Sequence, residues 1–315
     1  MVPRKVGTDW EVLAPAKLNL YLQVQSKRSD GFHDLETLMV PVRLFDHLRW
    51  SPSNSGNTAP AAEIGSEGLS FSVDARALNL HPEQVTSLES SENLVPRAAR
   101  LLATRIGCPP RGHFQLTKRI PLQAGLGGGS SDAAATLRLA NACWNGGLSE
   151  VELTDIAAQL GSDVPFFLQD GPAVCRGRGE LVSTTSGLPK MHFVLVKPPL
   201  GLSTAAVFQE VAALPERESL EVDRLSKLLE TLQIGAVGAA CQWMTNRLEA
   251  IAAQMAPEVL RIKASLRAAG CWGQMMTGSG STVFGIARSA THARWIARRL
   301  TAQRIGTVFV TSSGW

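Results

Sequence analysis

The chain reads Pro121-Leu-Gln-Ala-Gly-Leu-Gly-Gly-Gly-Ser-Ser-Asp132 and continues at once into Ala-Ala-Ala-Thr-Leu-Arg-Leu-Ala140. The four glycines can adopt positive φ values and let backbone N–H groups approach an anion closely. Either Ser130 or Ser131 is a suitable N-cap for the helix that the following residues predict over 132–142. A loop of amides at a helix N-terminus is typical of phosphate binding, so we interpret this stretch as a phosphate-binding loop.

The glycine stretch differs from three common motifs. No lysine follows the glycines, which excludes a Walker A loop. Counted from Gly125, a dinucleotide-binding Gly-x-Gly-x-x-Gly motif would end on Ser130, and counted from Gly127 it would end on Asp132. Asp132 also stands where a nucleophile elbow requires glycine. A flexible turn is the alternative for a glycine cluster alone, and the Ser-Ser-Asp segment before an alanine-rich helix favours the phosphate-binding loop.

The composition indicates a globular protein with a sizeable core. The 315 residues suffice for two domains of ordinary size, and 44% are hydrophobic while 18% are charged. The net charge of +4 is only mildly basic and is not gathered into blocks with interleaved aromatic residues. This pattern favours a polyanionic small molecule as ligand over a nucleic acid.

The cysteines are five in number and widely spaced, and none forms a Cys-x-x-Cys pair. This spacing argues against a disulfide framework or a zinc site and indicates a reducing compartment. No apolar run approaches the ~18–20 residues that cross a bilayer, and the first residues lack the apolar core of a signal peptide. We therefore expect a cytoplasmic protein that binds neither membrane nor nucleic acid.

Strand and helix patterns alternate irregularly, so the sequence predicts an α+β fold rather than a doubly wound parallel sheet. The predicted strands are 12–24 with an interruption at Pro15, 35–42, 114–120, 192–197, 274–277, 283–286 and 305–311. The predicted helices are 94–106, 132–142, 149–160, 205–211, 223–232, 241–253, 257–269 and 290–303. Residues 51–68 predict a surface hairpin or loop, and the glycines between 170 and 190 favour a domain boundary there.

Two further segments carry polar residues in positions that suit either a site or ordinary structure. Lys17 and Asn19 are two residues apart in a predicted strand, so they share one face, which is either a solvated edge or the wall of a site. Asp163 lies in a turn just before apolar residues. It is either a turn aspartate that bonds its own backbone or a functional carboxylate.

Two loops leave similar alternatives open. Phe32 and His33 lie on a turn, where they either pack locally or contact a nucleobase. A second glycine-serine loop separates two predicted strands and is either a flexible turn or a second set of anion-binding amides. The loop contains Gly278, Ser279 and Gly280.

Taken together and in this order, these segments resemble the GHMP kinase superfamily. The matching strings are Ala14–Leu20, Arg28–Leu35, Pro121–Ala135, Gly161–Phe167, Asn246–Glu249 and Met276–Gly285. Chance occurrence of all six together is far rarer than of any one. The resemblance implies mixed sheets with packed helices, an N-terminal ATP-binding kinase domain at 1–178, a C-terminal GHMP-kinase domain at 179–315 and an active site in the cleft between the domains.

The resemblance implies transfer of the γ-phosphoryl group of ATP to a hydroxyl group, with Mg²⁺ bridging the phosphates. Asp163 would accept the proton of that hydroxyl, and Lys17 would pair with Asp163 and face the transferred phosphoryl group. No protein ligand of Mg²⁺ is predicted. The ATP-binding residues would be Pro121, Leu122, Gln123, Ala124, Gly125, Leu126, Gly127, Gly128, Gly129, Ser130 and Ser131.

The substrate implied by the resemblance is a cytidine diphosphate conjugate of methylerythritol. Phe32 and His33 would hold its cytosine, with Phe208 as a second stacking residue. Asn19 would line the pocket for the sugar alcohol. The floor of the site would be closed by Gly278, Ser279 and Gly280.

Two alternatives stay open at this point. Another small-molecule GHMP kinase would keep Asp163 and the glycine loop but lack the strings around Lys17 and His33. A non-catalytic nucleotide-binding member would be expected to lack Lys17 or Asp163, and both are present. We expect a monomer or a weak homodimer.

Overall fold

The computed structural model describes residues 1–28, 31, 33–52, 62–63, 68–78, 80, 82–212 and 223–314. Phe32 and most of the predicted 51–68 loop therefore lie outside the described residues. The chain divides into two compact units that interleave along the sequence. The first unit comprises Met1–Ala16, Leu44–Pro121 and Gly127–Asp170, and the second comprises Lys17–Arg43, Leu122–Leu126 and Gly171–Trp315.

The strands that contribute to the first unit follow the order β1-β2-β3-β6-β5-β4 in one sheet. β1 pairs antiparallel with the start of β2, and the end of β3 pairs antiparallel with β6. β6 in turn lies parallel to β5, which pairs with β4. The bounds of these strands are β1 (Arg4–Val6), β2 (Asp9–Lys27), β3 (His33–Ser51), β4 (Ala62–Glu63), β5 (Leu69–Asp74) and β6 (Gly112–Thr117).

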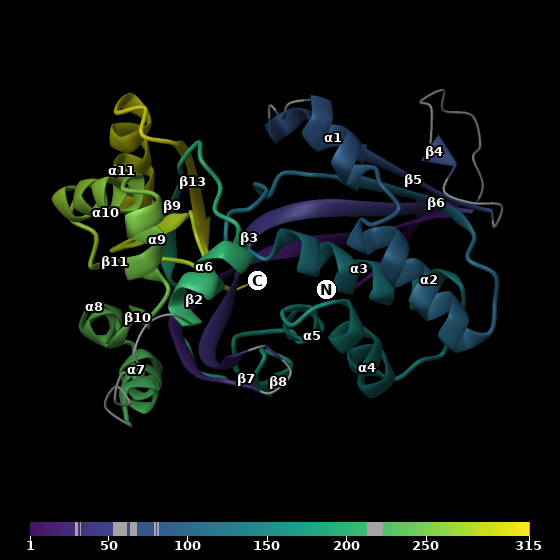
Figure 1. The fold of residues 1–315 in the computed structure, drawn as a ribbon, viewed down its shortest axis with the longest axis horizontal. Helices are drawn as coiled ribbons and strands as arrows, with labels where there is room; N and C mark the ends of the chain where they lie inside the picture. The colour runs from purple at the N-terminus through teal and green to yellow at the C-terminus, as the bar shows by residue number, and fades with distance from the viewer. Residues whose placement is uncertain are drawn as a thin grey trace. The chain divides into compact units, whose positions relative to one another are not determined.

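Helices of the first unit pack around an alanine-rich segment (Figure 1). The side chains of Ala133–Ala135 in α3 are fully buried, and such small side chains let α2 and α3 approach each other closely. α5 packs against both α3 and α4. The bounds are η1 (Arg76–Leu78), α1 (Pro82–Leu88), α2 (Leu94–Ile106), α3 (Gly128–Cys143), α4 (Glu150–Leu160) and α5 (Val164–Phe167).

The second unit contains a four-stranded antiparallel sheet in the order β11-β12-β9-β13. The remaining residues of β2 and β3 also belong to this unit, where β10 pairs with β2 and β7 pairs with both β3 and β8. The bounds are β7 (Ala173–Gly177), β8 (Leu181–Thr184), β9 (His192–Lys197), β10 (Thr245–Asn246), β11 (Gly273–Met276), β12 (Val283–Ala287) and β13 (Thr307–Ser312).

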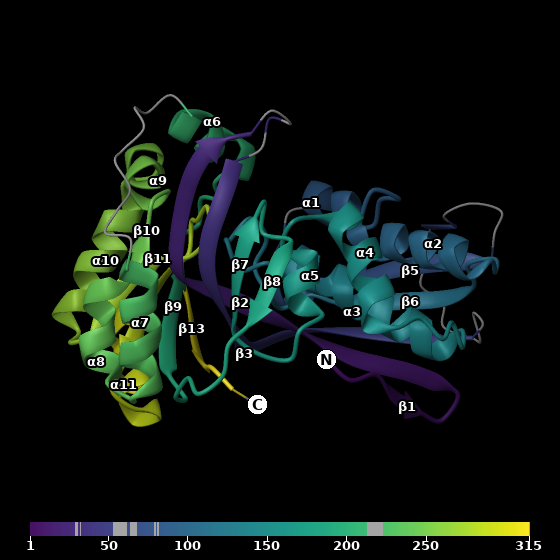
Figure 2. The same ribbon diagram turned by 90° about the horizontal axis from the view of Figure 1, so that it is seen from below.

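Two helices of the second unit, α10 and α11, pack against this sheet (Figure 2). Buried side chains of both helices, Ile262 and Ile296 among them, form one core with Val194 and Val283 of the sheet. None of the described helices is both long enough and apolar enough to span a membrane. The bounds are α6 (Thr204–Ala212), α7 (Arg224–Gln233), α8 (Val237–Ala240), η2 (Cys241–Trp243), α9 (Glu249–Met255), α10 (Glu258–Ala268) and α11 (Ala290–Ala302).

The predicted α+β class is confirmed, and several helices appear where the sequence placed them. α2 has the predicted bounds 94–106, and α4 begins after Ser149, which forms a capping box with Glu152. The predicted boundary between residues 178 and 179 stays a prediction.

The predicted start of α3 is wrong. The helix begins at Gly128, after Gly127 in the left-handed conformation, so neither Ser130 nor Ser131 is its N-cap. Glycine lowers helix propensity, but the buried alanines that follow stabilise the helix by packing, and packing outweighs propensity here.

Two strand predictions are also wrong in extent. β2 runs through Pro15 without a break, because the φ of proline suits an extended strand and only one donor is lost. β3 continues to Ser51 instead of ending near residue 42. Its residues Asp46, Leu48 and Trp50 are buried and alternate with more exposed neighbours, which is the period of a strand.

The helix predicted over 241–253 is wrong in its first half. The chain forms the short 3-10 helix η2 and then the two-residue strand β10. Within the predicted range, only the part that belongs to α9 is an α-helix. β10 pairs with β2 through Thr245 and Asn246. This tertiary pairing replaces the local helical preference.

Candidate active site

Lys17 and Asn19 lie on one face of β2, as their spacing predicted. The Nζ atom of Lys17 donates a hydrogen bond of 2.6 Å to Asn19 Oδ1, and Asn19 Nδ2 donates one of 2.8 Å to Thr37 Oγ1. Both residues are only 3% exposed, which rules out the solvated-edge interpretation. A lysine buried in this way is held in one position by its partners, as a group that contacts substrate must be.

The glycine-serine loop after β11 lies directly beside this pair. The backbone N–H of Asn19 donates to Thr277 Oγ1 at 3.1 Å, which joins the loop to β2. A Cβ atom added at Gly278 would lie 3.2 Å from Lys17 Nζ. The second unit thus places the Lys17 ammonium against the backbone of the loop that contains Gly278, Ser279 and Gly280, which we call the third motif.

The segment Leu122–Leu126, which belongs to the second unit, packs against the same two elements. The backbone N–H of Lys17 donates to Leu126 O at 2.9 Å. Gly125 has φ +70°, and an added Cβ would lie 2.1 Å from Thr277 O, so only glycine fits there. This half of the predicted ATP-binding loop, which includes Leu122, Gln123 and Ala124, is therefore built onto the Lys17 strand and the Thr277 loop.

The two described residues predicted to contact the cytosine lie together in the second unit. The ring centroids of His33 and Phe208 are 5.9 Å apart with an interplanar angle of 33°. α6, which carries Phe208, is joined to the third motif by a 2.8 Å hydrogen bond between Thr204 Oγ1 and Ser279 Oγ. Residue 32 lies outside the described part of the chain.

The first unit holds the other half of the glycine loop, Gly127–Ser131, as the start of α3. The first N–H groups of an α-helix have no partner within the helix, so this turn offers amides to an anion. Ser131 Oγ is buried, and among the described residues it has no hydrogen-bond partner. Pro121, the first residue of the predicted loop, belongs to the same unit.

Asp163 lies at the N-cap position of α5 in the first unit, and its carboxylate makes no capping hydrogen bond to that helix. The following residues Val164–Phe167 are all buried, which fixes the backbone beside the carboxylate. Lys17 belongs to the other unit, so the predicted pairing of the two residues stays a prediction.

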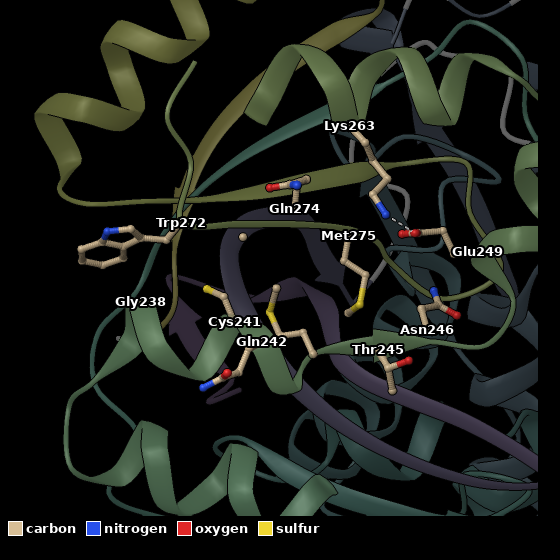
Figure 3. Close-up of a pocket in the computed structure, with 12 residues that line it drawn as sticks. Gly238, Cys241, Gln242, Thr245, Asn246, Glu249, Lys263, Trp272, Gln274 and Met275 are labelled. Carbon is tan, nitrogen blue, oxygen red and sulfur yellow. Dashed lines mark hydrogen bonds and ion pairs between the residues drawn. The ribbon is translucent and has the colours of Figure 1, made fainter. Parts of the chain in front are cut away.

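A pocket of about 440 Å³ in the second unit is lined by residues of η2, β10, α9, α10 and β11, among them Asn246 and Glu249 (Figure 3). Asn246 Nδ2 donates to both Met276 O and Gly278 O at 2.8 Å. Glu249 accepts from the Met276 N–H at 2.7 Å and pairs with Lys263, toward which it points in Figure 3. These pocket residues hold the loop in place. The sequence identified the string Asn246–Glu249 but assigned it no role.

We predict that Asn246→Asp weakens the third motif. A carboxylate cannot donate, and it would face the carbonyl oxygens of Met276 and Gly278. Loss of two buried hydrogen bonds costs on the order of 1–3 kcal/mol, so kcat/KM for the alcohol substrate should fall by about 10-fold or more. The matched control is Gln242→Glu, an exposed amide-to-acid change in the same pocket. Equal kcat/KM values for Asn246→Asp and Gln242→Glu would contradict the role of Asn246 in holding the third motif.

Comparison with known proteins identifies the family of this chain. Residues 93–171 match the family model of the GHMP kinases N terminal domain, and residues 225–305 match that of the GHMP kinases C terminal. A relative from Pelotomaculum thermopropionicum named 4-diphosphocytidyl-2-C-methyl-D-erythritol kinase is 40% identical over 91% of this chain and 92% of its own length. The chain belongs to the GHMP kinase family. Membership makes it an ATP-dependent enzyme of the kinase class.

Three further proteins are similar to this chain to different degrees. A relative of the same name from Moorella thermoacetica is 39% identical over 91% of this chain and 93% of its own length. The crystal structure of a 4-(cytidine 5'-diphospho)-2C-methyl-D-erythritol kinase superposes with a TM-score of 0.75 at 35% identity, covering 97% of this chain and all of the other. A homoserine kinase from Cytophaga hutchinsonii has a TM-score of 0.72 at 17% identity over 99% of this chain and 96% of its own, which shows the fold alone.

Proposed function

We propose that this GHMP kinase transfers the γ-phosphoryl group of ATP to the 2-hydroxyl group of 4-diphosphocytidyl-2-C-methyl-D-erythritol, a step of the non-mevalonate (MEP) pathway to isoprenoid precursors. The observation that carries the proposal is the buried Lys17–Asn19 pair beside Gly278. Relatives that are 34–40% identical to this chain are named 4-diphosphocytidyl-2-C-methyl-D-erythritol kinase.

The chemical roles follow from the charges that phosphoryl transfer creates. Asp163 would accept the proton of the attacking hydroxyl, and Lys17 would face the transferred phosphoryl group. Phosphoryl transfer passes through a loose transition state and depends mainly on positioning and charge stabilisation. The short hydrogen bond from Lys17 to Asn19 supports this role, because it fixes where the positive charge lies. Asn19 would also line the pocket for the erythritol moiety.

ATP would be held by the backbone amides of the loop from Pro121 to Ser131, together with Mg²⁺. Mg²⁺ takes oxygen ligands and usually combines one or two protein oxygens with phosphates and water. Ser131 Oγ fits this need, because it is buried and has no hydrogen-bond partner in the described part of the chain. When bound, the ion would neutralise charge that develops on the phosphates.

The cytosine would stack on Phe208 beside His33, with Phe32 as a further contact. We predict that Phe208→Ala raises KM for the cytidyl substrate by about 10-fold and leaves KM for ATP unchanged, since stacking of a base on an aromatic ring contributes about 1–3 kcal/mol. Phe208 also packs against the core of the second unit, so Phe208→Leu is the control that keeps an apolar side chain without a ring. An unchanged KM for the cytidyl substrate in both variants would remove Phe208 from the site.

An ATP-consumption assay with Mg²⁺ tests the proposed function, using the cytidyl substrate beside mevalonate, homoserine and galactose. Turnover with the cytidyl substrate alone is the expected result. Turnover with mevalonate, homoserine or galactose instead would be consistent with the roles of Lys17, Asp163 and the glycine loop but would contradict the cytosine pocket. ATP binding without any turnover would favour the non-catalytic alternative. A cytoplasmic location and a monomer or weak homodimer stay predictions.

A further inference from the structure

Three charged side chains are buried together beneath the glycine loop, all within the first unit. Lys118 follows β6 and is 2% exposed, and Asp46 lies in β3 and is fully buried. Asp132 lies in α3, just after its first turn, and is 3% exposed. Lys118 Nζ donates to Asp46 Oδ2 and, at 2.8 Å, to Asp132 Oδ2. We call these residues the Lys118 triad.

The Asp46 arm of the Lys118 triad holds the chain that enters the glycine loop. Asp46 Oδ1 accepts hydrogen bonds from the backbone N–H groups of Arg119 and Ile120, at 2.5 Å and 2.9 Å. These residues directly precede Pro121, where the loop begins. Asp46 therefore fixes the last two residues before the loop.

The Asp132 arm holds the helix by which the chain leaves the loop. A Cβ atom added at Gly128 would lie 3.2 Å from Lys118 Nζ and 3.0 Å from the Ile120 side chain, so the ammonium lies directly against the first residue of α3. One ammonium group thus joins the two ends of the loop, through Asp46 on the entry side and Asp132 on the exit side.

Attraction of a phosphate by positive charge does not explain why the three side chains of the Lys118 triad are buried together. Two carboxylates face one ammonium, so the Lys118 triad presents no excess positive charge to a phosphate. Burial raises the pKa of the Asp132 carboxyl well above its usual range, with Lys118 opposing the rise and Asp46 adding to it. Burial lowers the pKa of Lys118, but the carboxylates of Asp132 and Asp46 outweigh burial and raise it. Buried ion pairs are often no more stabilising than apolar side chains of similar volume. We therefore attribute the arrangement to the backbone positions that its hydrogen bonds fix.

We propose that Lys118, Asp46 and Asp132 are positioning residues that set the separation between the two ends of the ATP-binding loop. The inference rests on the proposed role of that loop in holding phosphates. It assigns a role to three residues of different elements that the sequence did not bring together. None of the three needs to contact ATP for the role to hold.

The test is Asp132→Ala, which releases α3 and leaves Lys118 paired with Asp46, so that one positive and one negative charge remain. The dissociation constant of a non-hydrolysable ATP analogue, measured by calorimetry, should rise by about 10-fold or more, as expected for the loss of a charged hydrogen bond. KM for the alcohol substrate should change less than about twofold. Asp132→Asn keeps an oxygen acceptor for Lys118 and should restore most of the affinity.

The matched control is Asp74→Ala, at the end of the neighbouring strand β5, because its carboxylate pairs with the exposed Arg76 instead of the loop. A lower melting temperature for Asp132→Ala with unchanged affinity for the analogue would overturn the proposal and leave a purely structural role. Should Asp132→Ala fail to fold, Asp132→Val fills the space without an acceptor and makes the same prediction. The ATP analogue binds without the alcohol substrate. The affinity measurement therefore still tests the positioning role if the proposed alcohol substrate proves wrong.

Discussion

Replacing Asp163 with asparagine is expected to lower kcat by ~10²-fold or more while ATP still binds. Asparagine has nearly the same shape as aspartate but cannot accept the proton of the attacking hydroxyl. The backbone at this position is held by the buried residues Val164–Phe167, so the substitution should leave α5 in place. The measurements are kcat at saturating substrates and the dissociation constant of a non-hydrolysable ATP analogue.

The control for Asp163→Asn is Asp155→Asn on the exposed face of α4, which makes the same chemical change in the same unit. Its kcat should equal that of the unchanged protein. A kcat for Asp163→Asn that also stays unchanged would refute the assignment of the base. If Lys17 and Asp163 act as one unit, Lys17→Gln combined with Asp163→Asn should be little worse than the poorer single variant.

Gly125→Ala is expected to abolish most activity and to destabilise the second unit. The added methyl group would lie 2.1 Å from Thr277 O and 3.1 Å from the backbone of Gly280, atoms that cannot rotate away. The left-handed backbone at φ +70° adds its own cost for alanine. Together these effects should lower the free energy of unfolding by about 2–5 kcal/mol and displace the loop that touches Lys17. Denaturant unfolding and kcat/KM measure the two effects.

Gly235→Ala separates the clash from the backbone strain. Gly235 belongs to the same unit and has φ +78°, but nothing lies within 4 Å of the added Cβ. Alanine there should cost only about 1–2 kcal/mol and leave kcat/KM unchanged. Equal losses of stability and activity in Gly125→Ala and Gly235→Ala would show that the close contact between Gly125 and Thr277 contributes to neither.

Local sequence patterns predicted much of the fold and of the site. The glycine loop, the shared face of Lys17 and Asn19 and the third motif depend on residues that are neighbours in sequence, so composition and spacing reveal them. The same is true of α2 and α4, whose apolar periodicity and capping residues are local.

Features that depend on distant contacts could not be predicted in this way. Lys118 is 72 residues from Asp46 and 14 from Asp132. Asp132 belongs to the glycine-loop pattern, but nothing in the local sequence links it to Lys118 or Asp46. Asn246 lies in a stretch with a helical pattern, yet its amide bonds the carbonyl groups of Met276 and Gly278 and the chain leaves the helix. In both cases the deciding partner is far away along the chain.

The interleaving of the two units has a consequence for synthesis on the ribosome. Residues Lys17–Arg43 belong to the second unit, and apart from the short segment Leu122–Leu126 the rest of that unit begins with Gly171, about 130 residues later. At about 5–20 residues per second, these strands wait on the order of 6–25 s before β7 exists to pair with β3, and longer before β10 exists to pair with β2. Throughout that interval the nascent chain carries Leu22 and Val24 without the second-unit core that later buries them.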